Sequence, residues 1–65
     1  MIKTAIRLKN NMVVVFDESG AEIPEYQGQY EEVKKSILKD APPNALFAHD
    51  FTDPGELRKV PREEW

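Results

Sequence analysis

Two strand-like runs separated by the pair Asn10-Asn11 make up residues 1–17, MIKTAIRLKNNMVVVFD. Asparagine tolerates the left-handed backbone region better than most residues. A two-residue loop with positive φ matches the twist of two antiparallel strands. The segment therefore predicts a β-hairpin, with Leu8 opposite Val13 and Ile6 opposite Val15.

This register gives the hairpin one apolar face and one mixed face, because side chains alternate along a strand. The apolar face would carry Ile2, Thr4, Ile6, Leu8, Val13 and Val15. The mixed face would carry Lys3, Ala5, Arg7, Lys9, Met12, Val14 and Phe16. A slip of one residue would turn the basic side chains toward the core, which is costly. We therefore expect the apolar face to be covered and the mixed face to be open.

A tight turn and a short third strand are predicted after the hairpin. Asp17-Glu18-Ser19-Gly20 has the residues of a type I turn that ends in a left-handed glycine and sets Phe16 opposite Glu22. Residues 21–26 would return as a strand. Pro24 lacks an N–H group, so this strand would be bulged or at an edge.

One helix and two further strands are predicted in the rest of the chain. Apolar residues recur three and four positions apart over residues 29–41, which predicts an amphipathic helix with Tyr30, Val33, Ile37 and Ala41 on its inner face. Strand-like segments follow at 44–51 and 57–60, and Asp53-Pro54-Gly55 fits a type II turn between them. In 44–51, the side with Ala45, Phe47, His49 and Phe51 would face the core.

These elements predict an α+β fold in a single domain, residues 1–65. An antiparallel sheet of three to five strands, in the order β-β-β-α-β-β, would have the helix packed on one face. The second strand, apolar on both sides, would lie between two neighbours. The chain has no cysteine, which is typical of a reducing compartment. Charge interrupts its first residues, so we expect a cytoplasmic protein without a membrane span.

The open sheet face suggests a non-enzymatic protein-interaction module. Met12, Val14, Phe16 and Tyr26 would form its apolar centre, with charged residues around them, as in many interfaces. Trp65 would fill a pocket, either in its own fold or in a partner. The partner would be another protein or a second copy of the chain, and no cofactor is implied.

The same face has an alternative interpretation as a single-stranded nucleic-acid site. Lys3, Arg7 and Lys9 alternate along the first strand beside Phe16, and bases can stack on an aromatic side chain flanked by cations. The net charge of −3 gives no global attraction for nucleic acid. Binding would therefore depend on this basic stripe.

A third hypothesis is a small hydrolase centred on His49, the only histidine. Asp50 or Asp53 would orient the imidazole as a general base. Neighbours on a strand point to opposite faces, however, so Asp50 is poorly placed for this role. The alternative is a partly buried histidine with a main-chain partner. One imidazole and two carboxylates make a weak metal site, so no metal is predicted.

The helix that begins with Tyr30-Glu31-Glu32-Val33 follows two or three strands. In this layout, residues 1–40 resemble the partner-binding domain of HicB-type antitoxins. Asp17-Glu18-Ser19-Gly20 stands where a turn with proline and glycine would be expected. The resemblance implies a domain that binds a protein partner.

Overall fold

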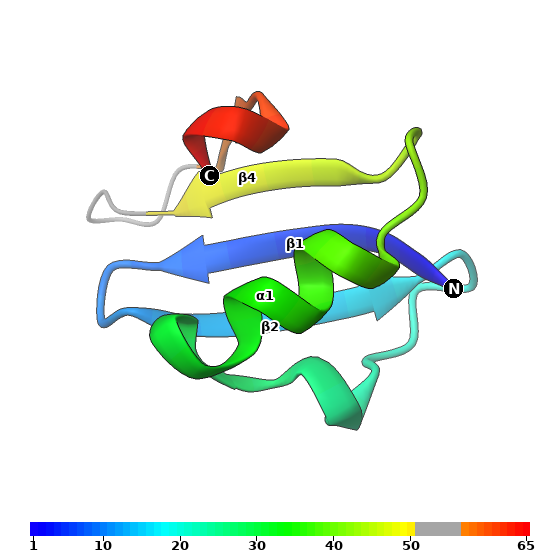
Figure 1. Ribbon diagram of the computed structural model, residues 1–65, viewed down its shortest axis with the longest axis horizontal. Coiled ribbons are helices and arrows are strands. Elements are labelled where there is room, and N and C mark those ends of the chain that lie inside the picture. Colours follow the sequence, from blue (N-terminus) through cyan, green and yellow to red (C-terminus); the bar gives the residue numbers. More distant parts are fainter. Residues whose placement is uncertain (51–56) are drawn as a thin grey trace.

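A single open sheet organises the computed structural model, which describes residues 1–50 and 57–65. Its elements are β1 (Ile2–Leu8), β2 (Met12–Asp17), the 3₁₀ helix η1 (Pro24–Tyr26), β3 (Gly28–Gln29), α1 (Tyr30–Asp40), β4 (Leu46–Asp50), β5 (Arg58–Val60) and the 3₁₀ helix η2 (Arg62–Glu64). The strands lie in the order β3-β2-β1-β4-β5, and α1 crosses one face of the sheet (Figure 1). The predicted α+β class and the order of the elements are confirmed.

The sheet is mixed, so the prediction of a purely antiparallel sheet is wrong at one pair. β1 pairs with β2, β2 with β3, and β4 with β5 in antiparallel fashion, whereas β1 and β4 are parallel. Parallel strands need a crossover connection, which is usually a helix. β3 runs in the direction of β1, and α1 carries the chain across the sheet to β4, which then runs in the same direction.

The β1–β2 hairpin has a three-residue loop, so the predicted register is wrong by one residue. Asn11 has a φ of 67°, and its N–H group donates to the Leu8 carbonyl oxygen at 2.9 Å. A type I turn followed by one left-handed residue is a common three-residue hairpin loop. The resulting partners are Ala5 with Val15, Ile6 with Val14 and Arg7 with Val13.

The shifted register exchanges the two faces of β1. Ala5 and Arg7 now lie on the side of α1, and Ile6 and Leu8 lie on the opposite side. A break in register between Ile2 and Thr4 returns Ile2 to the core, where it is 2% exposed. Lys3 lies at this break and Lys9 lies in the loop, both exposed. Of the three basic side chains that a slip of one residue was expected to turn toward the core, only Arg7 therefore lies on the side of α1.

The core lies between the sheet and α1, as predicted. Ile37 of α1 packs with Val13 and Val15 of β2, and all three are fully buried. Tyr30 and Ala41 are also buried, and Val33 packs against the core, which confirms the predicted inner face of the helix.

The turn at residues 17–20 is confirmed, but the strand expected after it is not formed. Gly20 has a φ of 87° and donates to the Asp17 carbonyl oxygen at 3.0 Å. Residues 21–26 contribute only the isolated bridge between Phe16 and Glu22, because Pro24 begins η1 and the third strand comes at Gly28–Gln29.

The two later strands are confirmed at Leu46–Asp50 and Arg58–Val60. Phe47 is buried and Ala45 packs against the core, as expected for the inward side of this segment. The predicted position of Phe51 and the type II turn at 53–55 lie outside the described residues.

Candidate interaction surface

The side of the sheet turned away from α1, here called the open sheet face, is predominantly apolar. Its side chains form three rows across β2, β1 and β4: Phe16–Thr4–Leu46, Val14–Ile6–Ala48 and Met12–Leu8–Asp50. Seven of these nine residues are apolar. The surface is therefore apolar over its whole centre.

The helices of the described chain all lie on the other side of the sheet. The Tyr26 hydroxyl of η1 donates to Asp40 of α1. Arg62 of η2 donates to carbonyl oxygens at the end of α1. On the open sheet face Ile6, Leu8, Met12, Val14 and Phe16 remain partly exposed, and Leu46 is 39% exposed. Helices thus cover only one of two apolar faces.

Charged residues lie at the margins of the open sheet face. Glu22 lies beyond β2, opposite Phe16, and Lys59 lies on β5, opposite Ala48. Asp50 is at the end of β4, and its Oδ1 atom is buried without a hydrogen-bond partner in the described structure. The apolar centre therefore has a charged rim.

The structure brings three of the predicted partner-binding residues together. Met12, Val14 and Phe16 lie on the open sheet face as expected, since the predicted alternation of β2 is confirmed. The predicted face lacked Ile6 and Leu8, because the hairpin register was one residue off. Tyr26 does not belong to this face, since η1 packs it against the core on the side of α1.

Trp65 is 2% exposed, so of the two predicted pockets, one in its own fold and one in a partner, the structure forms the first, and Trp65 does not belong to the exposed partner-binding set. Its ring meets those of Tyr30 and Phe47 edge to face, at centroid distances of 5.4 and 5.1 Å. Its Nε1–H group donates to the Ala48 carbonyl oxygen at 3.0 Å. The pocket for Trp65 is therefore in its own fold.

The predicted basic stripe does not form. The Arg7 guanidinium lies on the helix side, 3.6 Å from the centroid of the Tyr30 ring. It also donates to Asn11 Oδ1 at 3.0 Å and lies 3.4 Å from the Trp65 main-chain oxygen. Lys3 and Lys9 are outside the regular pairing. Phe16 thus has no line of cations beside it on the open sheet face.

His49 lies among main-chain contacts on the helix side. Its Nε2 atom is 3.3 Å from the Trp65 main-chain oxygen, which also accepts from the Tyr30 hydroxyl at 2.9 Å. Asp50 lies on the opposite face, as strand alternation requires. The alternative of a partly buried histidine with a main-chain partner is therefore what the structure shows.

No protein-family model, curated protein or solved structure matches this chain. Within residues 1–50 and 57–65, no helix is long and apolar enough to cross a membrane. The same residues contain no group of three or more potential metal ligands close enough to hold an ion.

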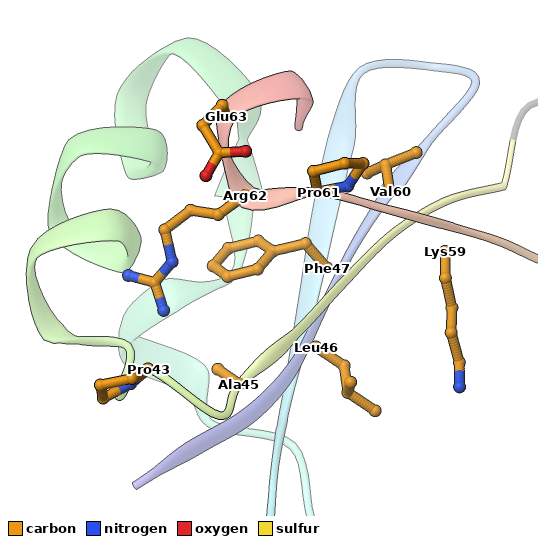
Figure 2. A pocket seen from close by; sticks show the side chains of 9 residues that line it. All are labelled: Pro43, Ala45, Leu46, Phe47, Lys59, Val60, Pro61, Arg62 and Glu63. Carbon is orange, nitrogen blue, oxygen red and sulfur yellow. The ribbon is translucent and has the colours of Figure 1, made fainter.

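A groove of about 360 Å³ lies where β4, β5 and η2 meet (Figure 2). Its lining residues are Pro43, Ala45, Leu46, Phe47, Lys59, Val60, Pro61, Arg62 and Glu63. The Arg62 guanidinium is 5.0 Å from the Phe47 ring centroid and donates to the Pro42 carbonyl oxygen at 2.6 Å. Leu46 and Lys59 point away from that ring (Figure 2). Through these two residues the groove adjoins the open sheet face.

Proposed function

We propose that this chain is a non-enzymatic interaction module that binds a protein through its open sheet face. The observation that carries the proposal is a sheet apolar on both faces, with the helices of residues 1–50 and 57–65 over only one. Strands apolar on both sides are typical of sheets that are buried on both sides. Large contiguous apolar patches on soluble domains commonly mark interaction sites.

The distribution of charge favours a protein partner over a nucleic acid. Among the described residues placed by strand pairing at the margins of the open sheet face, Lys59 is a cation and Glu22 and Asp50 are carboxylates. Nucleic-acid affinity depends on cations that neutralise phosphates. An apolar centre inside a charged rim is instead the usual anatomy of a protein interface. The absence of cysteine suits a cytoplasmic location, which is part of this proposal.

Site-specific photo-crosslinking in the native cell tests the proposal. A photoreactive phenylalanine analogue in place of Phe16 should give a covalent protein adduct, because this ring lies on the open sheet face. The same analogue in place of Ser36, exposed on the outer side of α1, is the matched control and should give little adduct. Adding Val14→Lys to the Phe16 probe should remove the product.

Two outcomes would contradict the proposed function. One is an absence of adducts at position 16. The other is equal labelling at positions 16 and 36. Far-UV circular dichroism of both probe-bearing proteins verifies that their fold is retained.

A further inference from the structure

We infer that the occupant of the open sheet face is a second copy of this chain. In this arrangement the two sheets pack face to face around a two-fold axis parallel to β1. The inference rests on the function proposed above, because it names the partner of the same surface. It is carried by the opposite charges at the two edges of that face.

Opposite charges lie at opposite edges of the open sheet face. Glu22 is directly opposite Phe16, so its side chain is on the same face, beyond β2. Lys59 is directly opposite Ala48, so it extends from β5 to this side as well. Four strand spacings of about 4.8 Å separate the two residues by about 19 Å. They are therefore too far apart to pair within one chain.

A two-fold axis parallel to the strands makes these edges complementary. It exchanges the left and right edges of the sheet and keeps each residue's position along the strands. Lys59 of each copy then lies over the edge that carries Glu22 of the other, so the contact forms twice. An axis perpendicular to the strands would place β5 on β5 and bring the two Lys59 edges together.

The positions along the strands fit this contact. Glu22 is level with Thr4, and Lys59 is level with Ile6. The offset of two residues is about 7 Å, which a lysine and a glutamate side chain together can span. Asp50, the third charge, is level with Leu8 at the end of β4, so in this arrangement it lies at the end of the shared core, near Met12 of the other copy.

The flat area of the sheet fits a weak, reversible dimer. The five strands are seven, six, two, five and three residues long, and at about 4.8 Å between strands and about 3.3 Å per residue they cover about 360 Å² per copy. Two copies would bury about 730 Å² by this measure, which is the size of a weak, transient contact. The shared core would contain Ile6, Leu8, Met12, Val14, Phe16 and Leu46 from each copy, as in aligned β-sandwiches.

Sedimentation equilibrium of the full chain tests the inference. Over about a hundredfold range of concentration, the mass should rise from one chain toward two. Val14→Lys should stay at the mass of one chain, and Ser36→Lys should behave as wild type. Circular dichroism verifies that both variants are folded. A wild-type chain that stays monomeric, or a Val14→Lys chain that dimerises normally, overturns the inference.

Mixing two charge-reversal variants tests the axis. Glu22→Lys alone and Lys59→Glu alone should each weaken association about tenfold, because each places like charges together twice. An equal mixture should form a heterodimer with nearly wild-type affinity, because every contact is then between opposite charges. A mixture that associates no better than either variant overturns the proposed geometry.

Crosslinking at position 16 separates this inference from the proposed function. An adduct with twice the mass of the chain supports the second copy. An adduct with a different protein alone leaves the proposed function intact and overturns the dimer. No adduct overturns both.

Discussion

At the scale of a single residue, Trp65 connects three elements, α1, β4 and η2. It contacts Tyr30 of α1 and Phe47 of β4, and its main-chain N–H group donates to the Arg62 carbonyl oxygen of η2 at 3.3 Å. Removing a large buried ring costs about 3–5 kcal/mol, which is similar to the whole stability of many small domains. We expect Trp65→Ala to be largely unfolded in buffer.

Circular dichroism and urea titration would measure this loss. Trp65→Phe is the matched control, because it keeps an aromatic ring in the pocket and loses the Nε1–H bond to Ala48. It should remain folded with reduced stability. If Trp65→Ala unfolded cooperatively at the same urea concentration as wild type, this would contradict the role of the ring in the core.

Asp17 organises the turn at residues 17–20 through its carboxylate. Oδ1 accepts from the Ser19 hydroxyl at 2.6 Å, from the Ser19 N–H group at 2.9 Å and from the Ala21 N–H group at 3.1 Å. The Ser19 hydroxyl is the largest of the causes that lower the pKa of Asp17 below its usual 3.8. Because the folded pKa is the lower one, this stabilisation is present above about pH 4 and is lost as the pH falls through the folded pKa.

NMR titration of the Asp17 carboxyl group would test this assignment. In Ser19→Ala the pKa should rise toward 3.8, since the main bond to the ionised form is gone. The stability difference between wild type and Asp17→Ala should also shrink as the pH is lowered through this range. A pKa unchanged by Ser19→Ala would show that the hydroxyl does not stabilise the carboxylate.

At the scale of elements, Asn11 sets the register of the β1–β2 hairpin. Its backbone is left-handed, and its side chain accepts from Arg7 Nε and donates to Glu31. Asn11→Gly and Asn11→Ala lose the same side-chain bonds. Only alanine adds the steric cost of the left-handed region, about 1–2 kcal/mol. We therefore expect Asn11→Ala to be less stable than Asn11→Gly by that amount in urea titration, and equal stabilities would refute this account.

Local patterns predicted most of the elements. Residue spacing located α1, Asp17 and Gly20 located the turn, and alternation along β2 located Met12, Val14 and Phe16 on the open sheet face. Each of these signals spans only a few residues. Those parts of the fold and of the surface were therefore accessible from the sequence alone.

Which side chains of β1 turn toward α1 depended on contacts that cannot be read from the sequence. The predicted two-residue loop places both Asn10 and Asn11 in the left-handed region, whereas the three-residue loop places only Asn11 there, and this difference in loop length moves β1 by one residue. Arg7 becomes tolerable on the helix side because the Tyr30 ring and the Asn11 amide oxygen lie beside it. The parallel pairing of β1 with β4 and the pocket of Trp65 likewise join distant segments.

At the scale of the whole molecule, the proposed dimer would couple stability to concentration. A partner that binds only the folded state raises the apparent stability by mass action. We expect the thermal midpoint of the wild-type chain to rise over about a hundredfold increase in concentration. That of Val14→Lys should stay constant. Circular dichroism in cuvettes of different path length measures both thermal midpoints. A wild-type midpoint that does not change with concentration would argue against the dimer.

The parallel pairing of β1 with β4 also bears on how quickly the molecule assembles. Ala5 and Phe47 are partners although about forty residues separate them, and a loop of this length must close before the pair gains any energy. The β1–β2 hairpin and α1 depend on nearby residues and need no such closure. We therefore expect the return of residues 46–50 to β1 to be the slow event of folding.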